Sequence, residues 1–290
     1  QDYISLLPDE LSLTIGSKFE HNDYTGFEVQ PNIRLLWRAD DRNTFWSAIS
    51  RAVRTPGMVE HDAHLTQQVI PGTPVTELSL QGNKDYRSET VVAYEAGYRW
   101  QAHELLSTDL ALFYNQYDHL RSVEPGVPEF GGTPPHVIVP FAVDNLMEGN
   151  TYGLELAVEY FPIDGGQLKG AYTYLKMNME RKDGRFDPIL VLAEGYVPRH
   201  QVSLRSAMNL PRGFELDMWL RYVDDLPAPS ISDYWNMDAR IGWRPTPSWE
   251  FAIVGQNLFD SSRQEFSPEI YDLATTEIER SFYFKATWNF

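Results

Sequence analysis

Apolar and polar side chains alternate at the end of this chain, in the sequence IERSFYFKATWNF. Phe282, Phe284, Trp288 and Phe290 occupy alternate positions together with the small Ala286, and the residues between them are mostly polar. Successive side chains of a β-strand point to opposite faces, so a period of two places these aromatic groups on one face. The pattern predicts a β-strand with one apolar face and one polar face.

The same alternation recurs along the whole chain, for example in FELDMWLRY and GLELAVEYF. Most of the repeats contain 10–14 residues, which is longer than a usual strand of a soluble sheet and suits a tilted strand that crosses a bilayer. The pattern is weakest in 43–52. About twelve strands are predicted, at 9–20, 27–39, 43–52, 88–101, 105–118, 147–161, 167–179, 198–210, 213–225, 233–244, 248–259 and 278–290.

The connections between these stretches alternate in length. Long connections at 53–87, 119–146, 180–197 and 260–277 are separated by short ones, although the first connection, 21–26, is short where a long one is due. Bacterial outer-membrane barrels have short periplasmic turns and longer extracellular loops. The sequence therefore predicts an all-β, antiparallel transmembrane β-barrel with its polar face toward the lumen.

A soluble two-sheet sandwich is the alternative, because its inner faces would bury the same apolar positions. Tyrosine and tryptophan gather near the strand ends, which favours lipid, since aromatic belts mark membrane interfaces. These residues are Tyr98, Trp100, Tyr222, Trp243 and Trp249.

The amino-acid composition limits the classes of partner and binding site that are possible for the chain. The 290 residues carry a net charge of −17, which argues against a nucleic-acid partner. The absence of cysteine excludes disulfides and thiolate metal sites, and no apolar run is long enough for a transmembrane helix. The first residues, QDYISLLPDELSL, do not have the pattern of a signal peptide. The protein is therefore cytosolic, has had its signal peptide removed, or is a fragment that begins within a longer protein, and the strand pattern favours the fragment.

Five strings occur in the order found in one family. They are FWSAISRAVRTP (45–56), SETVVAYEAGYRWQAHELLSTDLALFYNQYDHLRS (88–122), NTYGLELAVEYFP (150–162), GQNLFD (255–260) and the closing IERSFYFKATWNF. In these strings the chain resembles the TonB-dependent outer-membrane receptors of Gram-negative bacteria, over essentially its whole length.

The resemblance implies a plugged, 22-stranded transporter barrel, of which 1–290 would be the C-terminal portion without the plug. The implied function is energy-coupled uptake of a bulky, scarce ligand, most often an iron chelate (siderophore or haem), with cobalamin or a glycan as other options. The implied partners are outer-membrane lipid, the TonB energy-coupling protein through the missing N-terminal part, and the barrel-assembly machinery. That machinery would recognise the closing strand through Phe282, Phe284, Trp288 and Phe290. No cofactor is expected, and a monomer is the family's usual state.

Candidate ligand-binding residues lie in the predicted outer loops and strand ends. They are Arg51, Arg54, His61, His64, Tyr86 and Arg121, with Arg87, His119, Phe130 and Tyr271 as further contacts. Arginine guanidinium groups bind carboxylate or catecholate groups through paired hydrogen bonds, but the same arginines could instead form ion pairs with carboxylates of the lumen. The two histidines have the spacing of a helical turn, yet solvated loop histidines and simple loop packing are the favoured interpretations of these residues.

Two other functions are compatible with a barrel of twelve strands. Such a number is even, so the strands could close by themselves into a passive pore or a truncated barrel. A known twelve-stranded outer-membrane barrel is a phospholipase with a His-x-Ser pair. This chain offers only His200 and Ser203, whose odd spacing in a strand turns them to opposite faces. No catalytic residue is therefore predicted. The Pro/Gly-rich stretch 125–140 predicts an irregular loop, and KDGRFD (182–187) predicts a turn.

Overall fold

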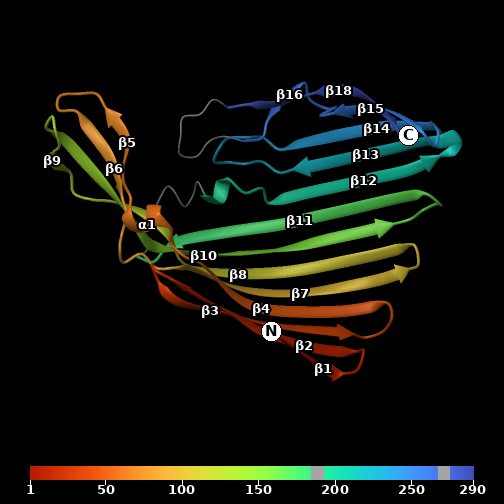
Figure 1. Ribbon diagram of the computed structural model, residues 1–290, viewed down its shortest axis with the longest axis horizontal. Helices are drawn as coiled ribbons and strands as arrows, with labels where there is room; N and C mark the ends of the chain where they lie inside the picture. Colours follow the sequence, from red (N-terminus) through yellow and green to blue (C-terminus); the bar gives the residue numbers. More distant parts are fainter. Residues whose placement is uncertain (184–192, 267–274) are drawn as a thin grey trace.

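The computed structural model describes residues 1–183, 193–266 and 275–290. In this part of the chain thirteen strands form one antiparallel wall, in the order β1–β2–β3–β4–β7–β8–β10–β11–β12–β13–β14–β15–β18. Figure 1 shows a curved single layer with β1 at one edge and β18 at the other. Within the described residues these edge strands do not pair with each other, so the wall is an open part of a barrel.

The strands of the wall are long, and short connections join most of them in sequence order. Their bounds are β1 Asp2–Leu7, β2 Leu11–Asn22, β3 Gly26–Arg38, β4 Asn43–Arg54, β7 Glu89–His103, β8 Leu106–Pro125, β10 His136–Tyr160, β11 Gly166–Arg181, β12 His200–Leu210, β13 Phe214–Val223, β14 Tyr234–Thr246, β15 Trp249–Gln256 and β18 Ser281–Trp288. The smaller elements are α1 Met58–Asp62, β5 His64–Ile70, β6 Thr76–Gln81, β9 Glu129–Gly131, a 3₁₀ turn Pro211–Gly213, β16 Ser262–Gln264 and β17 Glu277–Glu279.

All twelve predicted stretches overlap a strand of the wall, including the weak one at 43–52, which is β4. The alternation therefore predicted both the fold class and the individual strands. It missed β1, because this six-residue strand has large exposed apolar side chains on both of its faces, such as Tyr3 and Ile4. The antiparallel partner of β1 is β2.

The prediction of an irregular loop at 125–140 is wrong. Strand β8 continues to Pro125, β9 occupies Glu129–Gly131, and β10 begins at His136. These extensions form because β10 finds partners on both sides beyond the wall: it pairs antiparallel with β8 and β9, and parallel with β6. The parallel partner β6 lies in the predicted loop 53–87, far from β10 in the sequence, so local composition could not reveal the extension of β10.

Large side chains on the outer face form two aromatic rows. At the end with the short turns, Phe45 stacks between Trp37 at 5.3 Å and Tyr98 at 4.6 Å, measured between ring centroids. Farther along the strands Tyr94 pairs with Tyr114, which pairs with Tyr152. Exposed apolar residues such as Leu112 lie between the rows. An apolar band bordered by aromatic belts is the exterior of a membrane barrel.

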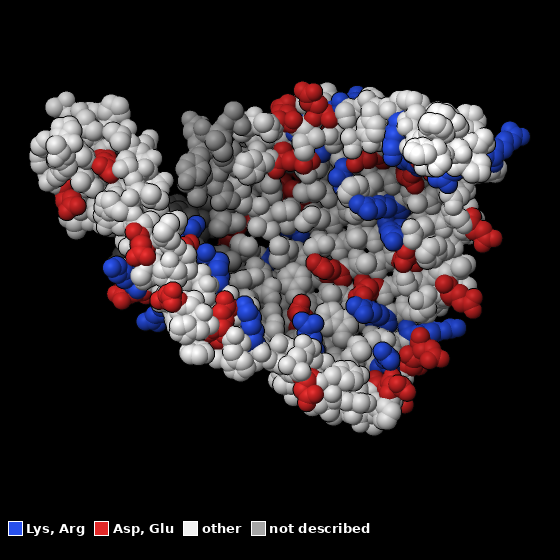
Figure 2. All heavy atoms as spheres, viewed as in Figure 1, with Lys and Arg blue, Asp and Glu red and all other residues white. Residues whose placement is uncertain are grey.

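The inner face is polar and hollowed. Figure 2 shows Lys and Arg side chains interspersed with Asp and Glu over the concave surface of the wall. Space on this face is limited at Gly97, where an added Cβ would lie 2.3 Å from the indole of Trp46. Glycine is required there because the tryptophan ring covers its backbone.

Few apolar residues are fully buried in this single layer; among those described, Val143 and Ala252 are only 2% exposed. Among the described residues no helix has both the length and the apolar character needed to cross a membrane. The structure therefore depends on strand pairing and on its two differing faces rather than on one compact core.

Candidate functional site

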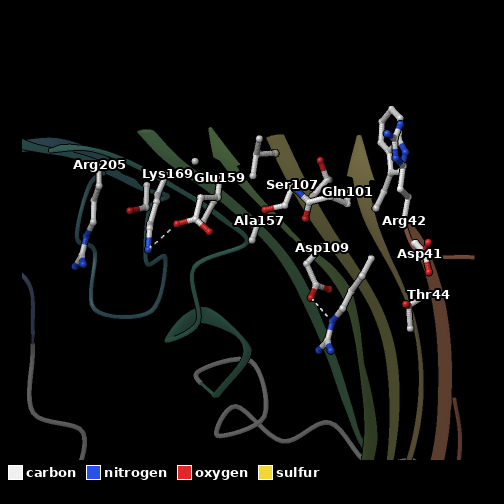
Figure 3. A pocket seen from close by; sticks show the side chains of 17 residues that line it. Asp41, Arg42, Thr44, Gln101, Ser107, Asp109, Ala157, Glu159, Lys169 and Arg205 are labelled. Atoms are coloured by element: carbon white, nitrogen blue, oxygen red, sulfur yellow. Dashed lines mark hydrogen bonds and ion pairs between the residues drawn. The ribbon is translucent and has the colours of Figure 1, made fainter. Parts of the chain in front are cut away.

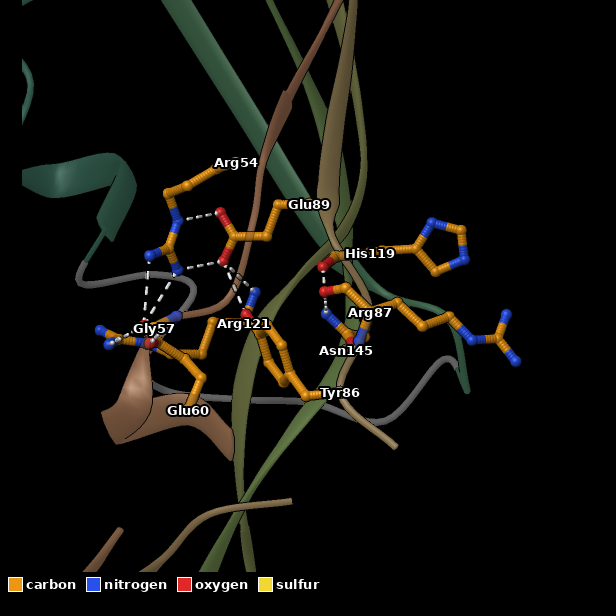
Figure 4. A network of polar contacts seen from close by, with 9 residues as sticks. All are labelled: Arg54, Gly57, Glu60, Tyr86, Arg87, Glu89, His119, Arg121 and Asn145. Atoms are coloured by element: carbon orange, nitrogen blue, oxygen red, sulfur yellow. Dashed lines mark hydrogen bonds and ion pairs between the residues drawn. The ribbon is translucent and has the colours of Figure 1, made fainter. Parts of the chain in front are cut away.

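A charged cluster joins the wall to helix α1 at the end that carries the long connections (Figure 4). Arg54, the last residue of β4, makes a two-point contact with Glu89, the first residue of β7. Its Nε and Nη2 atoms donate to the two carboxylate oxygens at 2.9 and 2.7 Å. The same guanidinium donates to Oε1 of Glu60 in α1 at 3.2 and 3.3 Å. Two-point arginine–carboxylate contacts fix orientation as well as distance.

Both carboxylates accept further hydrogen bonds. The hydroxyl of Tyr86 donates to Glu89 at 2.8 Å, and the backbone amide of Arg121 donates to the same oxygen at 3.1 Å. The backbone amide of Gly57 donates to Glu60 at 3.0 Å, and Nη1 of Arg121 lies 3.7 Å from the Glu60 carboxylate. The cluster thus connects four segments that are distant in sequence.

Burial and hydrogen bonding act in opposite directions on the acids of this cluster. Burial would raise the pKa of Glu60, but the amide of Gly57 and the guanidinium of Arg54 outweigh it and leave this pKa below its ordinary value. Tyr86 is only 3% exposed. Burial, followed by its hydrogen bond to Glu89, raises the pKa of Tyr86. At neutral pH Glu60 is therefore ionised and Tyr86 remains a neutral donor.

Asn145 fixes the neighbouring backbone. Its side-chain oxygen accepts from the amide of Arg87 at 2.6 Å, and its nitrogen donates to the carbonyls of Arg87 and His119 at 3.2 and 2.6 Å. His119 has a left-handed backbone, with φ of 57°, at an irregularity in the pairing of β8 with β10. A buried amide thus holds the segment before β7 against the bend in β8.

Three of the predicted ligand-binding residues, Arg54, Tyr86 and Arg121, come together in this cluster. The predicted alternative of ion pairing with carboxylates is what the structure shows for Arg54. Glu60 and Glu89 were not predicted. Glu60 lies in the predicted connection 53–87 and Glu89 is 35 positions from Arg54, so neither contact gave a local signal. The pairing of β4 with β7 is what places Arg54 opposite Glu89.

The other candidates lie elsewhere. Arg51 is three positions from Arg54 in the same strand, so it points to the opposite face. His61 is in α1, where its ring lies 4.8 Å from the ring of Tyr24, whereas His64 begins β5. The described residues contain no group of three or more His, Cys, Asp or Glu side chains arranged to hold a metal ion.

The further predicted contacts are also dispersed. Arg87 and His119 line a cleft with Arg51, and Phe130 in β9 is 70% exposed. Tyr271 and Asp187, the second acid of the predicted KDGRFD turn, lie outside the described residues. The predicted outer-loop candidates thus form one cluster and several separate positions.

A groove of about 660 Å³ runs along the inner face nearer the short turns (Figure 3). Two ion pairs border it: Nε of Arg99 lies 2.7 Å from Asp109, and Nζ of Lys169 lies 3.1 Å from Glu159. Arg205 projects into the same space. The lumen wall therefore presents paired charges of both signs rather than a field of one sign.

The last strands carry a second ionic cluster. Arg240 of β14 contacts Glu215 and Asp217 of β13 at 2.9 and 2.8 Å and Glu250 of β15 at 2.7 Å. Arg244 lies 3.4 Å from Glu215 and 3.1 Å from Glu250. All of these residues are on adjacent strands, so the cluster reinforces the sheet.

The pair considered for enzymatic catalysis does not form. Nδ1 of His200 shares a hydrogen bond with the hydroxyl of Tyr172 at 2.8 Å. The hydroxyl of Ser203 accepts from the indole of Trp219 at 2.8 Å. The two side chains engage different partners, as expected from their odd spacing.

The predicted assembly residues belong to the edge strand β18. Phe282 and Phe284 are 67% and 65% exposed, and Trp288 stacks on Trp249 at 5.8 Å between ring centroids. The ring of Phe290 lies 5.6 Å from that of Trp288. These aromatic groups occupy one face, as the alternation predicted, while one edge of β18 pairs with β15.

Comparison with known proteins places these features in a family. Residues 1–258 match the family described as TonB dependent receptor-like, beta-barrel. The iron-regulated outer membrane virulence protein of Vibrio cholerae serotype O1 is 25% identical over 276 residues, which cover 88% of this chain and 39% of that protein. The ferric enterobactin receptor of Pseudomonas aeruginosa is 25% identical over 63% of this chain and 25% of its own length.

Solved structures have the same fold. The siderophore receptor PirA from Acinetobacter baumannii superposes with a TM-score of 0.74 at 14% identity, covering 98% of this chain and 44% of that one. A variant of the ferric enterobactin receptor from Pseudomonas aeruginosa superposes with a TM-score of 0.72 at 19% identity, covering 99% and 44%. The chain thus spans about two-fifths of the length of such relatives.

Proposed function

The chain belongs to the TonB-dependent receptor family, and we propose that it forms the C-terminal part of an outer-membrane receptor that imports an iron–siderophore complex. The fold is that of an outer-membrane barrel of Gram-negative bacteria, and the family and its solved neighbours are receptors and transporters rather than enzymes. The names of the relatives, which refer to iron regulation, ferric enterobactin and siderophores, support the assignment of substrate class.

The open wall supports the proposal that this chain forms only part of a barrel. Thirteen strands leave unpaired edges at β1 and β18 in the described part of the chain. An unpaired strand edge in a bilayer leaves backbone groups without partners. A wall of this kind is therefore expected to continue into further strands, which argues against a passive pore made of these strands alone. The ligand path would run over the polar inner face.

We place the ligand contact of this chain at the Arg54 cluster. The side chains of Arg54 and Arg121 are 50% and 47% exposed, whereas those of Glu60 and Glu89 are 9% and 14% exposed. The acids are thus covered and the cations face open space. Guanidinium groups held in this way suit the oxygen atoms of a catecholate or carboxylate chelate, and His61 on α1 is a neighbouring candidate.

The remaining partners follow from the family. Energy coupling would come from the TonB protein through segments outside these residues, and no resident cofactor is required. The barrel-assembly machinery would recognise β18 through Phe282, Phe284, Trp288 and Phe290. Outer-membrane lipid would surround the receptor, which we expect to be monomeric.

Uptake of radioactive iron tests the function. The intact protein would be expressed in iron-starved cells that lack their own ferric enterobactin receptors, with and without a functional TonB protein. Uptake of ferric enterobactin should require both the receptor and TonB. Uptake that persists at the same rate without TonB would indicate a passive pore, and uptake that never exceeds the receptor-free cells would remove this substrate class.

A further inference from the structure

The outer face changes character along one set of paired positions. One row of cross-strand partners on this face is aromatic and apolar: Ile49, Tyr94, Tyr114 and Tyr152. The next outward row, two residues farther along each strand, is Arg51, Val92, Gln116 and Asn150. Tyrosine belts lie at the level of lipid headgroups. Arg51 therefore stands at or just beyond the headgroups on the lipid side of the wall.

A cleft of about 390 Å³ opens at this level. Three cationic side chains line it, those of Arg51, Lys84 and Arg87, together with the hydroxyls of Ser88 and Thr90. Among the described residues no carboxylate lies within ion-pair distance of these three cations. Nη1 of Arg51 donates to the backbone carbonyl of Val29 at 2.6 Å.

Two carboxylates, those of Glu28 and Asp85, also line the cleft. Glu28 accepts hydrogen bonds from Ser88 and from Thr25. Asp118 lies 2.5 Å from Nζ of Lys182 and next to His119, and Asp85 lines the cleft without an ion pair of its own among the described residues. The three cations outnumber the two lining carboxylates, so the cleft retains an excess of positive charge on a chain whose net charge is −17.

The cleft shares Tyr86 with the inner-face cluster, but its cationic side chains are different ones. Figure 4 shows the side chains of Arg87 and His119 pointing away from Arg54 and Glu89, to the other side of the strands. Arg51 and Arg54 point to opposite faces because an odd number of positions separates them in β4. A ligand of the lumen and a ligand of this cleft would therefore meet different arginines.

We propose that this cleft binds a phosphate group of an anionic lipid headgroup in the outer leaflet. Unpaired guanidinium and ammonium groups at headgroup level are the chemistry that recognises phosphorylated lipids. Phosphate oxygens would accept two-point contacts from Arg51 and Arg87 and one from Lys84, with the hydroxyl of Thr90 as a further donor. The acyl chains would lie on the apolar band below the tyrosine row.

The proposal is tested by native mass spectrometry of the intact protein in detergent, titrated with bisphosphorylated lipid A or with phosphatidylcholine. Lipid A should bind on the order of tenfold more tightly than phosphatidylcholine, and the combined variant Arg51→Gln, Lys84→Gln, Arg87→Gln should lose that preference. A matched control, Arg38→Gln, Arg212→Gln, Lys285→Gln, removes the same charge near the short turns and on β18 and should keep it.

Several outcomes would overturn the proposal. Equal binding of lipid A by the triple variant and the wild type would exclude these cations, and equal binding of both lipids would exclude phosphate recognition. Displacement of lipid A by comparable concentrations of inorganic phosphate would mean a site for free anions. Binding of ferric enterobactin by the triple variant, measured alongside, should be unchanged, which shows both that the variant is folded and that the lumen site is separate.

Discussion

The two arginine-centred clusters of the inner face differ in what they connect. Arg240 bridges carboxylates on β13 and β15, the immediate neighbours of its own strand. Arg54 also binds the neighbouring strand through Glu89, but its second partner, Glu60, belongs to helix α1 in a long connection. The first cluster reinforces the wall, whereas the second holds the segments between β4 and β7 in place. Similar chemistry therefore serves stability in one region and positioning in the other.

The comparison depends on correct assignment of the two faces, and the largest expected effect tests it. Leu112 is exposed on the outer face between the two aromatic rows, and Leu112→Arg should destabilise the folded barrel by about 2–4 kcal/mol in a bilayer. The adjacent Ala111→Arg places the same group on the inner face, where Glu155 is the cross-strand partner of Ala111. Urea unfolding in lipid vesicles measures both. Equal losses would mean that the faces are wrongly assigned.

A smaller effect is expected at the positioning cluster. Glu89→Gln removes the charge that holds Arg54 and should cost about 1–2 kcal/mol, a value reduced because Arg54 is half exposed. The consequence should be local: faster hydrogen exchange in residues 57–62 and 82–88, with the strands unaffected. Glu95→Gln is the control, because Glu95 is on the same face of β7 and forms no ion pair within the described part of the chain. Protection that stays unchanged in both segments would show that the cluster does not position them.

At the reinforcing cluster, Arg240→Gln should cost about 1 kcal/mol. The loss is limited because Arg244 still lies near Glu215 and Glu250. Exchange should increase slightly along β13–β15, and the segments around α1 should keep their protection. Loosening near α1 in this variant would remove the distinction between the two clusters.

The smallest effect concerns the extracellular hairpin β5–β6. The carbonyl of Pro134, followed by Glu77 at 2.8 Å, raises the pKa of His136 above 6.5. Hydrogen bonding by Thr66, followed by His136, lowers the pKa of Glu77. The stabilisation from protonated His136 is present below its unfolded pKa and is lost as pH rises through its folded pKa. Hydrogen exchange of residues 64–81, corrected for the intrinsic pH dependence of exchange, should therefore accelerate as pH rises through the folded pKa of His136.

The variant His136→Gln serves as the reference for this pH dependence. After the same correction, the exchange rate of its hairpin should no longer change in this pH range, because Glu77 is already ionised there. A wild-type hairpin that behaves like the variant would show that the contact with Glu77 contributes nothing.

The sequence revealed the wall far better than the site. Alternation is a local signal, so all twelve predicted strands exist, and the residues of the Arg240 cluster could be placed on one face from their spacing alone. The Arg54 cluster depends on Glu60 and on the segment around Tyr86, whose positions follow from the course of the long connection 53–87. Long-range pairing also decided the course of β10, where β6 supplies a partner that composition does not predict.

Separation of the two arginines Arg51 and Arg54 illustrates the same point. Their proximity in sequence suggested one ligand site, yet the period of two in β4 places them on opposite faces. The predicted strand ended at residue 52 and left Arg54 in the connection 53–87, so the separation became evident only from the structure, in which β4 extends to Arg54. Recognition of the cleft around Arg51 required the structure, because Lys84 and Arg87 come from a segment with no regular pattern.

Equilibrium binding of ferric enterobactin by the intact protein, measured by quenching of tryptophan fluorescence, tests most directly the claim that the Arg54 cluster positions the ligand contact. The wild type, Glu89→Gln and Arg240→Gln would be compared under the same conditions. We expect Glu89→Gln to weaken binding on the order of tenfold, and Arg240→Gln to bind like the wild type. Equal affinity of Glu89→Gln and the wild type would contradict the claim.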